Sequence, residues 1–201
     1  MVNSKLKSLF VGNSVFIFGG SLLVPIYALF TEDIGATVQM TGLLFAAKFV
    51  ATALADIVIM RIPHKFNNAV AVYQWSMFVR ALAWLYIGVA PSITSLLIVQ
   101  IVTGLAEGFG TPAFSTLMTN ALDKKRQMQQ WALWDLIKNP VLAASGIAGG
   151  FIANQYGFSV LFYAMGILAL AGTLVPVGNK GLKRRKAKQY AKLSYEYLFS
   201  R

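Results

Sequence analysis

The sequence predicts an all-α, multi-pass membrane protein with six transmembrane helices. Two observations lead to this prediction: the chain is rich in apolar residues, and these residues fall into six long runs. Of the 201 residues, 57% are hydrophobic and 12% are charged, and the mean hydropathy is +0.61. Average globular chains carry about 25% charged residues. A soluble domain of this size has too little interior for so much apolar surface, which argues against an ordinary soluble enzyme.

Each apolar run is long enough to cross a bilayer, since a transmembrane helix needs roughly 20 apolar residues. The six runs are residues 9–30, 39–60, 69–90, 93–117, 131–153 and 158–177. Short breaks with turn residues separate them, among them Ala90-Pro91-Ser92 and Asn154-Gln155-Tyr156-Gly157. The first run is too long, and too closely followed by others, to be a cleaved signal peptide. We therefore expect a six-helix domain over residues 1–178.

The basic residues indicate how the chain is oriented. Fifteen of the 18 Lys and Arg residues lie at the termini and in alternate loops, on one side of the predicted bundle. Lysine and arginine are enriched in cytoplasmic loops, so both termini are expected in the cytoplasm, with the helices in the cell inner membrane. The formal charge of +11 then results from the enrichment of basic residues in cytoplasmic segments, and it does not indicate a nucleic-acid partner. The basic tail, residues 179–201, is expected to be either an interfacial helix on membrane lipids or a solvated segment.

Several kinds of site are excluded by composition. The chain has no cysteine and one histidine, so it can form neither a disulfide nor a site built from two histidines. No nucleophile–base pair, phosphate-binding loop or metal-ligand set is evident, so neither enzymatic activity nor a cofactor is expected.

Three charged residues are expected near the membrane midplane: Lys48, Arg80 and Glu107, each on a different span. Charges at this depth are costly, and they usually face a cavity or a partner. Gln100 and Thr103 share a helix face with Glu107, which predicts a polar stripe. All five residues are candidates for substrate or ion coupling. Glu107 could carry a proton and Arg80 could hold an anionic group, or the three charges could form a static network.

Other residues have predicted roles in gating or packing. Asp56, Asp135 and Lys138 lie toward the cytoplasmic ends of spans, and Arg126 lies in a cytoplasmic loop; we expect structural or gating roles for them. Small residues let helices approach closely, which predicts helix packing or a dimer contact at five glycines. These are Gly104, Gly108, Gly146, Gly149 and Gly150.

Two motifs resemble those of the major facilitator superfamily. The run from Gln100 to Gly108 resembles the fourth-helix signature R-x-x-Q-G-x-G-x-x, and the run from Ser145 to Gly150 resembles G-P-x-x-G-G on the fifth helix. Two departures stand out. Gln100 replaces the signature arginine, and the loop pattern D-R-x-G-R is replaced by His64-Lys65-Phe66-Asn67-Asn68.

The resemblance covers about residues 8–178 and implies the amino-terminal six-helix half of a transporter. Full-length members of this family have two such halves, with the substrate site between them. A half alone would expose its polar cavity wall to lipid, so a second half is expected. The first hypothesis is a homodimeric secondary transporter of small molecules, with proton coupling as one option. The alternatives are a fragment that needs a second polypeptide, and a membrane scaffold that transports nothing.

Overall fold

The computed structural model describes residues 3–61 and 68–175, and in these ranges every regular element is a helix. The helices are α1 (Ser4–Ser21), the 3-10 helix η1 (Val24–Ile26), α2 (Tyr27–Asp33), α3 (Val38–Arg61), α4 (Ala69–Val89), α5 (Ile93–Ala121) and α6 (Gln127–Leu174). The loop at His64 and Lys65 and the predicted tail, residues 179–201, lie outside the described residues.

The first predicted span, residues 9–30, is longer and less regular than expected. It begins at Ser4, ends at Asp33 and is interrupted after Ser21. Pro25 lies at the start of η1. Proline has no N–H to donate, and its ring clashes with the carbonyl group four residues earlier, so the α-helix gives way to a tighter turn there. The interruption falls beside the charged cluster described below.

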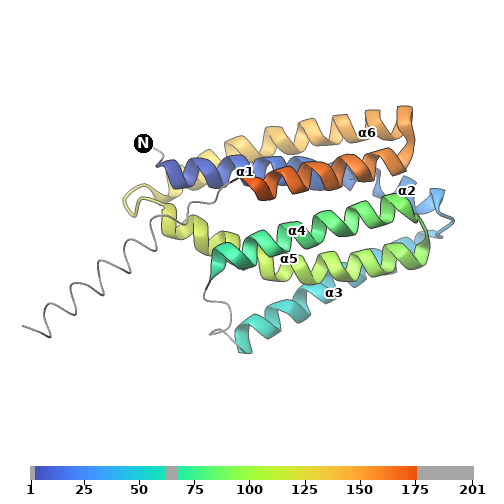
Figure 1. The fold of residues 1–201 in the computed structure, drawn as a ribbon, viewed down its shortest axis with the longest axis horizontal. Coiled ribbons are helices and arrows are strands. Elements are labelled where there is room, and N and C mark those ends of the chain that lie inside the picture. The colour runs from blue at the N-terminus through green and yellow to red at the C-terminus, as the bar shows by residue number, and fades with distance from the viewer. Residues whose placement is uncertain (1–2, 62–67, 176–201) are drawn as a thin grey trace, which may run out of the picture.

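α6 is 48 residues long and is broken at Gly157. That glycine has φ 80° and ψ 172°, a conformation that residues with a Cβ rarely adopt. Figure 1 shows that the chain reverses its direction here, so the two arms of α6 run side by side in opposite directions. The predicted span 131–153 lies on the first arm, and the described part of the predicted span 158–177, which ends at Val175, lies on the second. At 1.5 Å per residue, 48 residues measure about 72 Å, more than twice a hydrocarbon core of about 30 Å.

The helices pack in a consistent neighbour pattern. α1 lies along α6, α4 lies between α5 and α6, and α3 packs mainly on α5 (Figure 1). Aromatic contacts fix part of the core: the ring centroids of Phe30 and Phe162 are 4.7 Å apart, and those of Phe10 and Trp134 are 5.2 Å apart. α3 is the most exposed of the long helices, with 17% of its apolar stretch buried inside the bundle.

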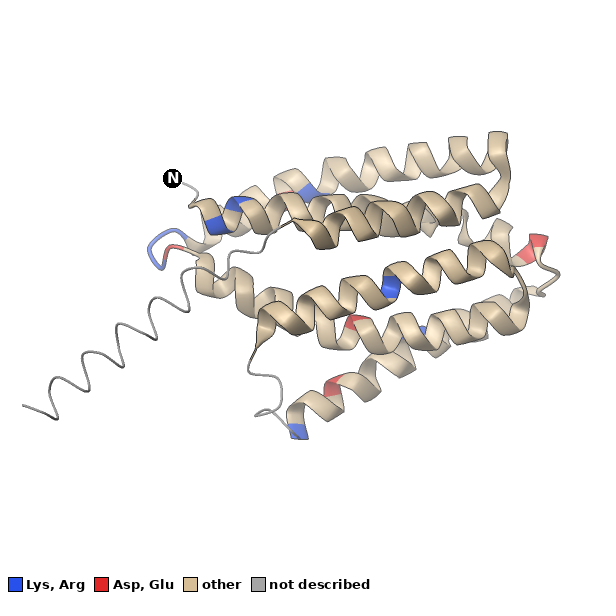
Figure 2. Cartoon of the chain, in the orientation of Figure 1, with Lys and Arg blue, Asp and Glu red and all other residues tan. Residues whose placement is uncertain are grey.

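The outer surface is suited to lipid. Among the described residues, five helices or helix runs are long and apolar enough to cross a membrane. Large apolar side chains such as Phe49, Ile147 and Phe151 are more than half exposed. Figure 2 shows Lys and Arg gathered at one end of the bundle, acidic residues at the other end, where α2 ends at Asp33, and a few charges in between. An apolar belt between two polar ends is the pattern of a multi-pass membrane protein.

Candidate functional site: a charged cluster between three helices

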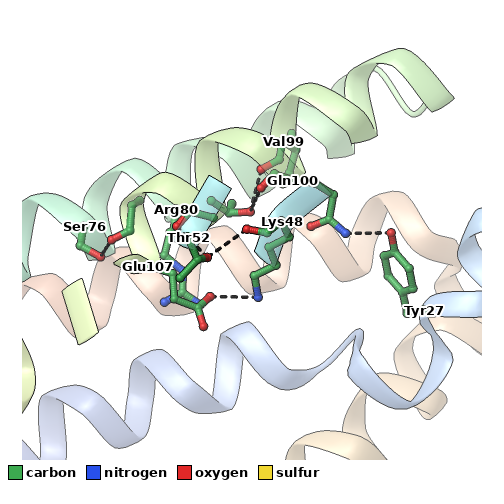
Figure 3. A network of polar contacts seen from close by, with 11 residues as sticks. Tyr27, Lys48, Thr52, Ser76, Arg80, Val99, Gln100 and Glu107 are labelled. Carbon is green, nitrogen blue, oxygen red and sulfur yellow. Dashed lines mark hydrogen bonds and ion pairs between the residues drawn. The ribbon is translucent and has the colours of Figure 1, made fainter. Parts of the chain in front are cut away.

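Lys48, Arg80 and Glu107 meet inside the bundle, although they come from α3, α4 and α5 (Figure 3). The Lys48 Nζ lies 2.9 Å from the Glu107 Oε2, and the Arg80 Nη2 lies 3.4 Å from the same oxygen. The side chains of Lys48, Arg80 and Glu107 are 26%, 18% and 30% exposed, respectively. The structure thus places together the three charges that the sequence predicts at the midplane.

Glycines on α5 allow this meeting because they let α3 approach. A Cβ on Gly104 would collide with the Lys48 carbonyl, and one on Gly108 would lie 2.6 Å from both the Ala55 Cβ and the Thr52 carbonyl oxygen. Thr52 ties the two helices together, since its hydroxyl lies 3.0 Å from the Gly104 carbonyl oxygen. The close approach brings the Lys48 side chain within reach of Glu107, one turn further along α5.

A similar contact joins α4 to α5. The Ser76 hydroxyl donates a hydrogen bond of 2.6 Å to the Ala106 carbonyl. Gly110 leaves room for Ser76, since a Cβ there would collide with the serine hydroxyl. Ser76 lies one helical turn before Arg80, so this contact holds the α4 segment that carries the guanidinium group.

Arg80 is held by aromatic rings as well as by charge. Its guanidinium carbon lies 4.7 Å from the ring centroid of Phe16 on α1 and 5.4 Å from that of Trp84 on α4. Arginine over an aromatic face is a favourable cation–π arrangement. The Arg80 Nε is buried and makes no hydrogen bond to any described residue.

Of the predicted polar stripe on α5, Glu107 is partly exposed, whereas Gln100 and Thr103 are buried. Gln100 donates to the Tyr27 hydroxyl at 2.7 Å, and the Thr103 hydroxyl donates to the Val99 carbonyl at 2.7 Å. Gln100 and Thr103 therefore lie on the same side of α5 as the cluster without touching its charges.

Two cavities adjoin the cluster, and Lys48 and Arg80 line both of them. The larger has a volume of about 340 Å³ and the smaller about 120 Å³. Glu107 lines the larger cavity only. Other polar residues of the larger cavity are Asn13, Ser21, Tyr73, Ser76 and Thr111, and those of the smaller are Tyr27, Gln100 and Thr103. Apolar and aromatic side chains complete both walls.

Sequence reasoning missed several of these residues. Tyr73 donates a buried hydrogen bond of 2.9 Å to the Asn13 Oδ1, which links α4 to α1. Asn13 lies in a span without charges, so a search for charged residues does not find it. An uncharged polar side chain within an apolar run is the signal available, because such groups inside a membrane usually find a partner.

The remaining charged candidates lie away from the cluster. Lys138 pairs with Asp135 on the same helix, with a Nζ–Oδ1 distance of 2.6 Å. Asp56 is exposed on α3 and makes no ion pair within the described part of the chain. Arg126 is exposed at the start of α6. None of these four residues lines either cavity.

The glycines of α6 have different surroundings. Gly149 packs so closely on the first span that a Cβ would collide with the Leu22 carbonyl. Gly146 faces Pro25, whose ring would lie 3.6 Å from an added Cβ. A Cβ added to Gly150 would meet no atom of residues 3–61 or 68–175 within 4 Å. Gly149 is therefore in close contact with the first span, whereas the described residues leave open space beside Gly150.

A bundle of long apolar helices around a half-buried charged cluster defines a multi-pass integral membrane protein. The sequence profile of the Major Facilitator Superfamily matches residues 9–196, and the chain belongs to this family of transporters.

Three relatives illustrate the match. The chain is 23% identical over 193 residues to the uncharacterized MFS-type transporter MJ1560 of Methanocaldococcus jannaschii, covering 92% of this chain and 50% of that protein. It is 26% identical over 156 residues to the uncharacterized MFS-type transporter YitZ of Bacillus subtilis, covering 75% of this chain and 92% of YitZ. It is 28% identical over 150 residues to the multidrug resistance protein MdtG of Salmonella paratyphi A, covering 71% of this chain and 36% of MdtG.

The alignments thus span about half of MJ1560, about a third of MdtG and nearly all of YitZ.

Proposed function

We propose that this chain is a half-size secondary transporter of small molecules, which works by alternating access as a homodimer. The observation that carries the proposal is the Lys48–Glu107–Arg80 cluster, which adjoins two cavities in a chain of the Major Facilitator Superfamily. Charges inside a membrane bundle mark substrate or ion pathways more often than they serve packing alone.

The proposed topology has six crossings. α6 contributes two of them, one on each side of Gly157. An even number of crossings would leave both termini on one side, and the Lys and Arg residues gathered at one end of the bundle support a cytoplasmic location for that side. In a bacterium the membrane would be the cell inner membrane.

The second half is proposed to be a second copy of the chain. Two copies related by a twofold axis along the membrane normal would have the same orientation and would form a self-complementary interface. The alignment of 156 residues covers 92% of YitZ, so YitZ is itself a short protein. This supports a half-size transporter. Gly150, which leaves open space beside it within one protomer, is a proposed contact at this interface.

The coverage of MJ1560 supports the main alternative. Because the chain matches only half of that transporter, the second half could instead be another polypeptide or a further segment of a longer one. In a scaffold protein the three charges would form a static network. Substituting them would then lower the stability of the protein and would change no transport rate, because the protein would transport nothing.

Coupling is proposed to depend on Glu107. Protonation of its carboxylate would remove the negative charge that pairs with Lys48, so protonation and rearrangement of the cluster would be linked. Structural or gating roles are proposed for the four charged residues that line neither cavity and lie in the last turns of α3, or at the N-cap or in the first turns of α6: Asp56, Arg126, Asp135 and Lys138.

The test is transport by the purified full chain in proteoliposomes. A panel of small organic cations, neutral compounds and anions is offered under an imposed proton gradient, and uptake and proton movement are recorded. The proposal expects uptake of at least one compound, with loss of proton movement in Glu107→Gln but not in Glu32→Gln, a matched change at the acidic end. Folded protein that moves no member of the panel would contradict transport, and unchanged proton movement in Glu107→Gln would contradict the role of that residue.

A further inference from the structure

The charges around the two cavities do not balance. Lys48 and Arg80 supply two positive charges and Glu107 supplies one negative charge. Among the other described residues that line the cavities, none is charged. A surplus positive charge away from water is costly unless a counter-charge accompanies it. A ligand with one negative charge would make the site neutral.

Of the two cations, Arg80 is the one whose hydrogen-bonding groups are not all used by the chain. The Glu107 carboxylate lies closer to Lys48, at 2.9 Å, than to Arg80, at 3.4 Å. The Arg80 Nε has no hydrogen-bond partner in the part of the chain that the structure describes. A guanidinium group presents its N–H groups as a planar fork, which binds the two oxygens of a carboxylate, phosphonate or sulfonate in parallel. The Arg80 side chain thus lines both cavities and has hydrogen-bonding capacity that the described helices do not fully use, with its Nε itself buried.

The surroundings of Arg80 also indicate what the rest of the ligand is. Phe16 lines the larger cavity, and Trp84, Tyr27 and Phe45 line the smaller one. Phe16 and Trp84 are the two rings that hold the guanidinium group. Aromatic faces favour a flat apolar group. Several polar side chains of the cavity walls are already bonded within the chain, including Tyr73 to Asn13 and Gln100 to Tyr27, so they offer less to a heavily hydroxylated ligand.

We propose that the cluster binds small organic monoanions with a flat apolar group, and that Arg80 binds the anionic head. This inference rests on the proposed function and assigns the substrate class of the same site. Lys48 and Glu107 remain paired with each other while the ligand supplies the missing negative charge. An inorganic anion could supply the same charge, so the experiment must separate the two sources.

The experiment measures binding by calorimetry to the full chain in lipid nanodiscs. Three probes share one ring and differ in charge: benzenesulfonate with one negative charge, benzenesulfonamide with none, and benzene-1,3-disulfonate with two. Methanesulfonate and chloride serve as anions without a ring. The proposal expects benzenesulfonate to bind most tightly, by about tenfold or more over benzenesulfonamide, the scale of a hydrogen bond to a charged group.

Two variants test the assignment of residues. Arg80→Gln should weaken benzenesulfonate binding by about tenfold or more, whereas Arg61→Gln, a loss of one charge at the end of α3, should not. Glu107→Gln raises the formal surplus to two positive charges, so it should shift the preference toward the disulfonate. This reversal gives a positive result that a misfolded protein cannot mimic, and it is available even if Arg80→Gln does not fold.

Three outcomes would overturn the inference: equal binding of the sulfonamide, binding of chloride or methanesulfonate as tight as that of benzenesulfonate, or no change of preference in Glu107→Gln. The second outcome would define a site for any small anion. Binding of benzenesulfonate without transport would contradict the proposed function and leave this inference standing. Transport of a neutral or cationic compound without sulfonate binding would contradict this inference and leave the proposed function standing.

Discussion

The Lys48 ammonium group on α3 lies 2.9 Å from the Glu107 carboxylate on α5, and this ion pair joins two helices at the centre of the bundle. Arg80 approaches the same carboxylate from α4. One acidic side chain therefore connects three helices, and its removal would leave two cations facing each other.

Glu107→Gln should lower the stability of the protein. Breaking a buried pair by removing one partner costs about 3–5 kcal/mol, but these side chains are roughly a quarter exposed, so we expect about 1–3 kcal/mol. The midpoint of thermal unfolding in detergent measures the effect. The double variant Lys48→Met/Glu107→Gln should lose less than the sum of its two single changes, because no unpaired Lys48 remains. Strict additivity would contradict the pairing.

Gly104→Ala should force α3 away from α5, because the added Cβ would collide with the Lys48 carbonyl. Overpacking of this kind costs about 1–3 kcal/mol. The control is Gly42→Ala on α3, where an added Cβ meets no described atom within 4 Å and alanine's higher helix propensity can only help. Thermal unfolding should separate the two variants. Equal midpoints would mean that α3 and α5 are not in close contact at Gly104.

Gly157→Ala should destabilise the turn within α6 by conformational strain. An added Cβ would meet no described atom within 4 Å, so steric collision is not the cause; the cost arises from φ 80° and ψ 172°. Strained backbone of this kind costs about 1–3 kcal/mol. The same unfolding assay applies, with Gly42→Ala again as the control. A midpoint equal to that of the control would contradict the reversal at this residue.

Gly150→Trp should weaken the proposed dimer without destabilising the protomer. Apart from its chain neighbours and the adjacent helix backbone, no described atom lies within 4 Å of a Cβ added at Gly150, so a side chain can begin there without collision. The ratio of dimer to monomer in nanodiscs is measured by native mass spectrometry, alongside the unfolding midpoint. A variant that remains as dimeric as the parent protein would remove Gly150 from the interface.

Much of the helical organisation could be predicted from the sequence, because apolar runs of bilayer length are a strong signal. The predicted break at Gly157 falls at the turn within α6, since the glycine follows a polar cluster after a long apolar run. The interruption near Pro25 has a local signal, since a proline within a span can kink the helix. The apolar run around it does not show that the span divides into α1, η1 and α2. A span that starts at Leu9 also misses the first turn of α1, where Leu6 is buried.

The candidate site was only partly accessible to sequence reasoning. Periodicity located Lys48, Arg80 and Glu107 on their helices but could not give their mutual distances, which depend on the glycine contacts between α3 and α5. Spacing groups Gln100 and Thr103 with Glu107, yet each bonds a nearer partner: the Tyr27 hydroxyl and the Val99 carbonyl. The link from Asn13 to Tyr73 spans 60 positions in the chain, and no local pattern predicts such a contact.

The central claim is the proposal that this chain works together with a second copy of itself. The most direct measurement is the native mass of the full chain in lipid nanodiscs, across a range of protein-to-nanodisc ratios that includes an excess of empty discs. The account predicts a dimer that persists when empty discs are in excess. A stable monomer under the same conditions would contradict the homodimer and direct attention to a different second half.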